Sequence, residues 1–310
     1  MPLGRRPILA WAHYTAGLSA QCAPSHAGVS GDLIEIARPF LAEGYVVAAT
    51  DYEGLGTPGP HPYLVGISEG RSVLDAIRAA QQLTGCVDDA EVVVLGLSQG
   101  GHAALWAAEL APTYAPELGL AAAVAVAPGG DLAAISKWMF GPAGTSVSWL
   151  NAVMVLSAWN QVYGLPLDRV LTPTGQALAL AVRTRCPDYA ALPSSQPLRA
   201  DPGLVQGWRE QVIANTPGAT RASAPILIVQ GTADEQVPAH TTVSLVRRLR
   251  AVGGDVELRL IDGGGHESGL FGPGRLKEIQ AWIHERCRDP GPNESRRSRG
   301  LSLGCEPVDR

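Results

Sequence analysis

The stretch that decides the fold is residues 91–108, which read EVVVLGLSQGGHAALWAA. The aliphatic run Val92–Leu95 predicts a buried strand, and the alanine-rich run after Gly101 predicts a helix. Between them lies Gly96-Leu97-Ser98-Gln99-Gly100, a G-x-S-x-G pattern. Because glycines let a backbone bend sharply from strand into helix, this pattern predicts a tight turn that exposes Ser98 above a sheet.

The same five-residue pattern occurs at two other places, 66–70 and 300–304. Ser68 follows the proline-rich segment 58–62 and opens a predicted helix, where a serine is typically an N-cap. Ser302 falls in a C-terminal stretch that has no periodicity. Only Ser98 follows a predicted strand directly, so we expect Ser98 to be the nucleophile.

Outward from this turn, apolar runs alternate with helical patterns along most of the chain. The runs are Ile8–Ala12, Tyr45–Thr50, Val92–Leu95, Leu120–Ala127, Ile226–Val229 and Val256–Ile261. The helical patterns are Asp32–Ala42, Arg71–Leu83, Gly101–Glu109, His240–Ala251 and Arg275–Cys287. Strand and helix in repeated alternation predict an α/β fold with a mostly parallel, doubly wound sheet and helices on both faces.

The alternation breaks once, where helical segments at 148–163 and 174–184 follow each other without strands. We therefore divide the chain into a core (1–130 and 223–287), an inserted helical cap or lid (131–222) and a disordered tail (288–310). The cap contains Trp138, Met139, Phe140, Trp149 and Met154, which we expect to line a substrate pocket. A core internal to the cap is the alternative role for these side chains.

A serine hydroxyl is a weak nucleophile until a base takes its proton, so an acid and a histidine should follow Ser98 in the chain. Asp234 lies in the loop after the predicted strand at 225–229, and His266 lies in the loop after the last strand. Parallel strands bring both loops to the same edge of the sheet, which predicts a Ser98–His266–Asp234 triad. Glu235 is the alternative acid.

The other histidines are weaker candidates for a role in the site. His13 is the rival for a site role, because it ends the first strand. His102 is interpreted as a packing or hydrogen-bonding residue. The remaining four, at 26, 61, 240 and 284, are interpreted as ordinary loop or helix-surface residues.

Acyl transfer also needs donors for the developing oxyanion. The backbone N–H of Gln99 is the first candidate. The second is Tyr14, after the first strand, or Asp51, after the second, and the residues themselves do not choose between them.

Composition excludes several other classes of function. A formal net charge of -5 and the lack of a basic run on a surface argue against nucleic-acid binding, and no apolar stretch is long enough to span a membrane. Five cysteines without C-x-x-C spacing predict buried thiols, with neither a disulfide framework nor a zinc site. No phosphate-binding loop is present, so we expect no metal and no cofactor. The N-terminal MPLGRRPILAWAHY lacks the apolar region of a signal peptide.

Several segments resemble the secretory lipases related to Candida antarctica lipase A. They are Trp11-Ala12-His13, Cys22-Ala23-Pro24-Ser25, Asp51-Tyr52-Glu53-Gly54, Gly96 to Gly101, Gln230 to Asp234 and Gly265-His266. The resemblance implies an α/β-hydrolase fold, hydrolysis of triacylglycerols or other carboxylic esters, a helical lid and no cofactor. It also favours Asp51 as the second oxyanion donor.

We therefore expect a monomeric serine ester hydrolase that acts on a small-molecule or lipid ester, with contact to a lipid interface through the cap. Two alternatives remain open. One is a peptidase or acyltransferase that uses the same triad, since a fold does not fix the leaving group. The other is a non-catalytic binding protein on a hydrolase fold.

Overall fold

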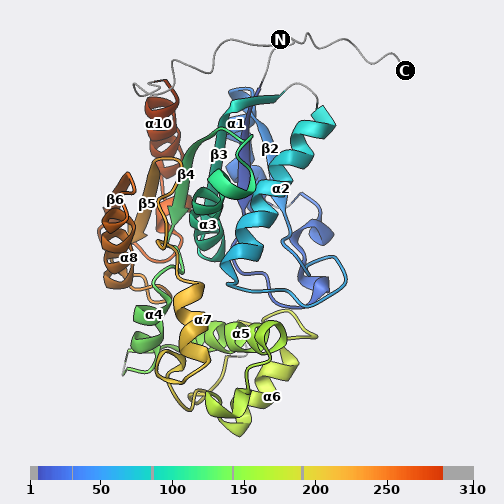
Figure 1. The fold of residues 1–310 in the computed structure, drawn as a ribbon, viewed down its shortest axis with the longest axis vertical. Helices are drawn as coiled ribbons and strands as arrows, with labels where there is room; N and C mark the ends of the chain where they lie inside the picture. Colours follow the sequence, from blue (N-terminus) through green and yellow to red (C-terminus); the bar gives the residue numbers. More distant parts are fainter. Residues whose placement is uncertain (1–5, 30, 85–86, 142, 190–191, 289–310) are drawn as a thin grey trace.

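The computed structural model describes residues 6–29, 31–84, 87–141, 143–189 and 192–288 (Figure 1). The predicted disordered tail, with Ser302, lies almost wholly outside these residues. Only its first residue, Arg288, is described, as the end of the last helix.

The centre of the molecule is a parallel sheet with strand order β2-β1-β3-β4-β5-β6. All six predicted strands are present, as β1 (Arg6–Ala12), β2 (Val46–Thr50), β3 (Val87–Leu97), β4 (Leu120–Val126), β5 (Ile226–Gly231) and β6 (Val256–Ile261). Their side chains alternate between two apolar layers, so that Val94 packs into one and Val93 into the other. Both layers are buried, which explains why the strands are continuous apolar runs.

Helices cover both faces of the sheet (Figure 1). On one face lie α2 (Gly66–Thr84), α3 (Gln99–Tyr114) and α8 (Ala239–Ala251). On the other lie α1 (Gly31–Ala42), the short α9 (Ser268–Phe271) and α10 (Arg275–Arg288). The prediction of a doubly wound α/β sheet is confirmed. Two helices begin earlier than predicted, α2 at Gly66 and α3 at Gln99, directly after Ser98.

Between β4 and β5 the chain forms a separate group of helices at the carboxyl ends of the strands (Figure 1). They are α4 (Leu132–Met139), α5 (Ser146–Tyr163), α6 (Pro173–Ala181) and α7 (Trp208–Ala214). Their apolar side chains form a third cluster, which also takes in Leu18, Tyr63 and Leu64 from loops of the core. The inserted helices therefore pack onto the core through shared apolar contacts.

A disulfide between Cys22 and Cys186 fastens the loop after β1 to the segment after α6, across 164 residues of chain. The expectation of buried thiols is thus wrong for these two cysteines. Sequence spacing could not reveal the pair, because the two residues meet only when the inserted helices fold back onto the core.

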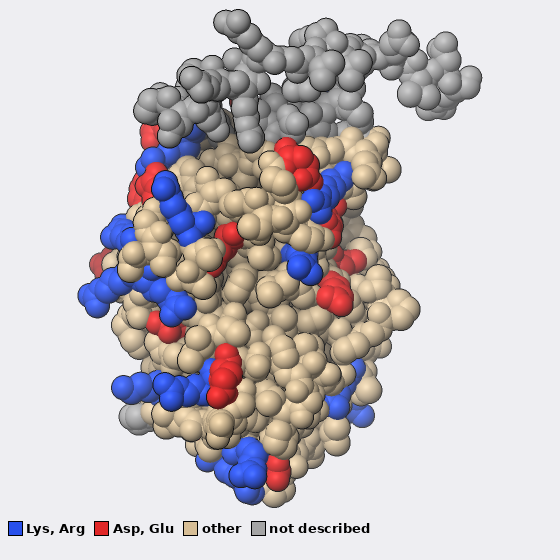
Figure 2. Space-filling view, viewed as in Figure 1, with Lys and Arg blue, Asp and Glu red and all other residues tan. Residues whose placement is uncertain are grey.

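The surface carries no concentration of one charge on the face seen in Figure 2, where basic and acidic side chains are interspersed among uncharged residues. Within the described ranges, no helix combines the length and the apolar character that crossing a bilayer requires.

The disulfide generates a stability prediction. The double variant Cys22→Ser/Cys186→Ser should lose roughly 2–5 kcal/mol of the free energy of unfolding, because a long loop is no longer closed in the unfolded chain. Urea unfolding of both proteins, with and without dithiothreitol, measures this. Reductant should bring the wild type to the stability of the variant and leave the variant unchanged; equal stability of the two oxidised proteins would contradict the prediction.

Candidate active site

Ser98 occupies a strained turn between β3 and α3. Its backbone has φ 58° and ψ -112°, in the left-handed half of conformational space that residues with a Cβ rarely adopt. The turn is held from β4 and its following loop, since Ser98 N–H donates to the Val126 carbonyl (2.9 Å) and Gly129 N–H donates to the Ser98 carbonyl (3.3 Å). Strain of this kind is characteristic of functional positions, and here it lifts the Ser98 side chain off the end of the strand.

The glycines around Ser98 are required by space. A Cβ at Gly96 would lie 2.0 Å from the Gly100 carbonyl oxygen, and a Cβ at Gly100 would lie 1.8 Å from the Ala12 carbonyl oxygen. The turn is therefore wedged against the end of β1, with no room for a side chain at either position.

The competing pattern at 66–70 has a different explanation. A Cβ at Gly66 would overlap the Trp106 ring at 1.9 Å, and one at Gly70 would meet Leu110 at 2.9 Å. These glycines allow α2 to pack closely against α3. Ser68 lies inside the first turn of α2 and donates to Glu53 Oε2, so the N-cap interpretation of Ser68 is wrong.

An acid–histidine pair lies at the same edge of the sheet. His266 Nδ1 donates to Asp234 Oδ2 over 2.8 Å, and the Asp234 side chain is fully buried. The N–H groups of Gln236 and Val237 donate to the other carboxylate oxygen, Oδ1. Glu235 is exposed and makes no such contact in the described structure, so the carboxylate that orients His266 is Asp234.

The environment keeps Asp234 ionised. Burial by itself raises the pKa of a carboxyl group, but here the hydrogen bond and charge of His266, followed by the two backbone N–H groups, outweigh it. The pKa of Asp234 is consequently lower than its usual value of 3.8. An ionised Asp234 fixes the Nδ1–H tautomer and leaves Nε2 of His266 free to accept a proton.

Ser98 and His266 are not hydrogen-bonded to each other among the described residues. Ser98 instead borders a cavity whose wall includes Gln236 and Val237, the neighbours of Asp234 in the loop after β5. Nucleophile–base contacts are often long until a substrate binds. The structure thus brings the acid and the base together and places the serine at the end of another strand on the same edge of the sheet.

The cavity lies between the core and the inserted helices and, with its open mouth included, takes in about 790 Å³. Two helices face it with a regular stripe each: Leu132, Ile135, Ser136 and Met139 from α4, and Ala152, Val155, Leu156 and Trp159 from α5. Each stripe follows the i, i+3, i+4, i+7 spacing of one helix face. That spacing is the sequence signal by which these residues could have been found.

The predicted pocket residues divide into two groups. Met139 and Phe140 line the cavity. Met154 is completely buried within the cluster of the inserted helices, while Trp138 and Trp149 are half-buried and stand outside the cavity wall. Only two of the five predicted pocket residues therefore line the cavity, and Met154 belongs to the core of the insertion.

The two candidates for the second oxyanion donor occupy different strand ends. Tyr14 follows β1, the immediate neighbour of β3, and its phenol hydroxyl donates to Asp32. Burial, then the hydrogen bond to Asp32, raises the pKa of Tyr14 to about 12. Asp51 follows β2, one strand farther from Ser98, and its carboxylate accepts from Ser25 N–H over 3.0 Å.

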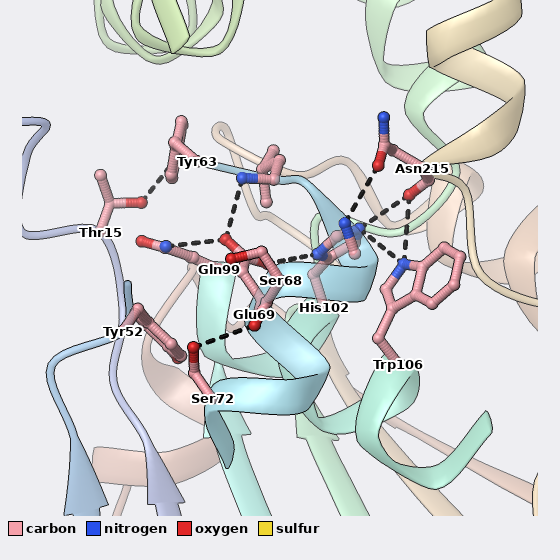
Figure 3. A network of polar contacts seen from close by, with 12 residues as sticks. Thr15, Tyr52, Tyr63, Ser68, Glu69, Ser72, Gln99, His102, Trp106 and Asn215 are labelled. Atoms are coloured by element: carbon pink, nitrogen blue, oxygen red, sulfur yellow. Dashed lines mark hydrogen bonds and ion pairs between the residues drawn. The ribbon is translucent and has the colours of Figure 1, made fainter. Parts of the chain in front are cut away.

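A buried polar network lies behind the Ser98 turn (Figure 3). Glu69 is fully buried, and its carboxylate accepts from Leu64 N–H, Gln99 Nε2 and His102 Nδ1 at 2.9, 2.8 and 2.6 Å. His102 Nε2 lies 2.8 Å from the carbonyl oxygen of Asn215, at the end of α7. The interpretation of His102 as a hydrogen-bonding residue is confirmed, and the network joins the nucleophile helix to the inserted helices.

Two other histidines are buried close to this network. His61 is only 2% exposed, so its interpretation as an ordinary loop residue is wrong. His13 is 6% exposed and packs against the ring of Tyr52. Burial lowers the pKa of both. In the described part of the chain, no group of three His, Cys, Asp or Glu side chains is arranged to hold a metal ion.

Two protein-family models match parts of the chain. The model of the secretory lipase family matches residues 24–158, which include β3, the Ser98 turn and α5 up to residue 158. Over these residues the chain resembles the secretory lipase family. A second model, that of the prolyl oligopeptidase family, matches residues 208–289, which contain both Asp234 and His266.

Individual lipases are similar to this chain over limited segments. Lipase 4 of Candida albicans is 43% identical over 112 residues, which are 32% of this chain and 24% of that protein. A Mycobacterium tuberculosis protein named a probable inactive lipase is 32% identical over 170 residues, 51% of this chain and 36% of that protein. The matched segments therefore cover well under half of either relative.

The fold is shared more widely than the sequence. Candida antarctica lipase A in its closed state superposes with a TM-score of 0.74 at 21% identity, over 92% of this chain and 73% of that one. The doubly wound sheet of this chain is thus an α/β-hydrolase fold.

The close packing of the Ser98 turn predicts that one added methyl group lowers the stability of the protein strongly. Gly100→Ala should lower the free energy of unfolding by roughly 2–4 kcal/mol, because the new Cβ meets a backbone oxygen that cannot swing away. Gly31→Ala is the control, since a Cβ there has nothing within 4 Å. Urea unfolding compares the two, and a Gly100→Ala protein as stable as Gly31→Ala would refute the steric argument.

The lowered pKa of Asp234 predicts the direction of a pH effect. The folded chain binds the Asp234 proton more weakly than the unfolded chain, so the stabilising contribution is fully present above about pH 4 and is lost as pH falls through the folded value. The difference in free energy of unfolding between wild type and Asp234→Asn should therefore shrink as pH falls from neutral to acidic.

Urea unfolding over a pH series, carried down to the lowest pH at which both proteins stay folded, measures this difference. Glu235→Gln removes an exposed carboxylate from the same loop and serves as the control. A difference for Asp234→Asn that stays constant or grows toward acid would contradict the assignment of the pKa.

Proposed function

We propose that this chain is a serine ester hydrolase in which Ser98 is the nucleophile, His266 the general base and Asp234 the carboxylate that orients the base. The observation that carries the proposal is the strained backbone of Ser98 at the turn between β3 and α3. Support comes from the hydrogen-bonded pair of Asp234 and His266 at the same edge of the sheet.

In the proposed reaction, Ser98 Oγ attacks the ester carbonyl while its proton passes to His266 Nε2. The tetrahedral intermediate collapses as His266 returns the proton to the alcohol oxygen, which leaves, and an acyl–Ser98 ester remains. Water then attacks this ester by the same route, its proton passing through His266 to Ser98 Oγ. Asp234 stays ionised throughout and stabilises the imidazolium that forms twice in the cycle.

The backbone N–H of Gln99 is the proposed first donor to the oxyanion, because it begins α3 directly after Ser98. For the second donor, the strand order favours Tyr14 over Asp51. Neighbouring strands are about 4.8 Å apart, so the end of β2 is one such step farther from Ser98 than the end of β1. The Tyr14 phenol is bound to Asp32, which leaves the backbone N–H as its donor.

The inserted helices, residues 131–222, are proposed as a cap that supplies an acyl-binding pocket. The cavity wall is mostly aliphatic and aromatic, with Met139, Phe140 and Trp159 among its residues. Such a wall suits a hydrocarbon chain, which gains free energy by leaving water. The proposed substrates are accordingly carboxylic esters with an apolar acyl group, including lipid esters.

The test is a set of single substitutions assayed with a p-nitrophenyl ester. Ser98→Ala and His266→Ala should each lower kcat by at least about a thousandfold, and Asp234→Asn by a similar factor, because these groups act as a unit. Ser68→Ala, a serine in the same five-residue pattern, is the matched control and should keep full activity. Wild-type turnover that survives Ser98→Ala would refute the assignment.

Two further reactions separate this proposal from its alternatives. The match of residues 208–289 to the prolyl oligopeptidase family favours a peptidase as the second candidate. Preference for a p-nitroanilide over the matching ester would establish the peptidase. The resemblance to a probable inactive lipase raises an idle site as a third possibility. Failure of a fluorophosphonate probe to label wild-type Ser98 would establish that.

A further inference from the structure

Gln99 borders the same cavity as Ser98, although only its backbone N–H has a part in the proposed reaction. Gln99 is 1% exposed, so its amide must find partners inside the protein. Figure 3 shows the amide nitrogen turned toward Glu69 and the oxygen turned away from it.

Both N–H bonds of the Gln99 amide are used. One donates to Glu69 Oε1 over 2.8 Å, and the other donates to His61 Nε2 over 3.0 Å. His61 can accept there because its Nδ1–H donates to the Glu53 carbonyl over 2.7 Å. Burial lowers the pKa of His61 by more than the charge of Glu69 and the bond to Glu53 raise it, which favours the neutral ring that this arrangement needs.

These partners fix which way the amide faces. If oxygen and nitrogen exchanged places, Gln99 Oε1 would face two acceptors, the Glu69 carboxylate and the lone pair of His61 Nε2, and both contacts would become repulsive. The observed orientation is therefore the only one that the surrounding groups permit.

The orientation leaves one atom without a partner. Gln99 Oε1 is buried and accepts no hydrogen bond from any described residue. A buried carbonyl oxygen without a donor costs free energy, so the protein holds Gln99 in a position that its own groups do not satisfy. Gln99 borders the cavity, so a molecule bound there can supply the donor once a small shift of the side chain uncovers the oxygen.

We propose that Gln99 Oε1 is a recognition site for a hydroxyl group of the substrate, placed within one or two bonds of the scissile ester. The inference rests on the proposed function, since it takes Ser98 to mark where the ester carbonyl lies. Gln99 follows Ser98 directly, so a group that reaches Oε1 is close to the reacting carbon. The preferred substrates are then hydroxy esters, and the hydroxyl is either on the acyl side or on the alcohol side of the ester.

Matched pairs of esters test this proposal and distinguish the two sides. Ethyl lactate and ethyl isobutyrate differ only by hydroxyl against methyl on the acyl side. Ethylene glycol monobutyrate and propyl butyrate differ in the same way on the alcohol side. In one of the two pairs, the wild-type kcat/KM should be roughly five- to tenfold higher for the hydroxy ester, the value of one buried hydrogen bond. Equal kcat/KM within both pairs would mean that a water molecule satisfies Oε1, and the proposal would fail.

The variant Gln99→Met removes the acceptor and keeps the backbone N–H and the side-chain length. It should lose the preference within the pair that the wild type discriminates. Gln236→Met is the matched control, because Gln236 lines the same cavity, and the preference should persist in it. Persistence of the preference in Gln99→Met would assign it to another group and overturn the proposal.

Binding to Ser98→Ala separates this inference from the proposed function. Titration of the four esters, followed by NMR, should give the hydroxy ester of the same pair a roughly five- to tenfold lower Kd. This result does not require turnover. If no ester is hydrolysed by the wild type, the proposed function fails, while the Kd ratio still decides whether Gln99 recognises a hydroxyl. Equal Kd values within both pairs would overturn the recognition site even in an active enzyme.

Discussion

The absence of a side chain at Gly96 and Gly100 is the constraint on which the site depends. The end of β1 and the first turn of α3 approach the Ser98 turn so closely that a Cβ at either glycine would meet a backbone oxygen at 2.0 Å or less. This close approach keeps the backbone of Ser98 in a conformation that it would otherwise leave. It also brings the end of β1, with Tyr14 after it, next to the residue that follows Ser98.

Buried carboxylates hold the loops around the site in place. Glu69 accepts from the backbone of Leu64 and from the side chains of Gln99 and His102. Glu109, on the same helix as His102, accepts from the N–H groups of residues 218–220, where the chain returns from α7 to β5. A buried carboxylate is tolerated only when donors surround it. Each of these therefore fixes a loop to α3, the helix that begins at the site.

Patterns of neighbouring residues were enough to predict the sheet, because each strand is an apolar run and the turn at Ser98 is rich in glycine. They also paired Asp234 with His266, since parallel strands deliver both loops to one edge. They failed where a residue meets partners from elsewhere in the chain: the bond between Cys22 and Cys186, the burial of His61 beside Gln99, and the division of the predicted pocket residues between cavity wall and packing inside the insertion. In each case the partners are far apart in the chain, and neither carries a local signal of the other.

The disulfide of Cys22 has a consequence for how a substrate reaches the cavity. The inserted helices are tied to the core by this bond, by the Trp159 side chain on the Tyr63 carbonyl, and by Asn215 against α2 and α3. With three attachments along its length, the insertion cannot swing away as one rigid flap. For a bulky ester of the proposed kind, entry then requires rearrangement inside the insertion, with its attachment points held still. The energy barrier to that entry is then set by how easily the apolar faces of α4 and α5 separate.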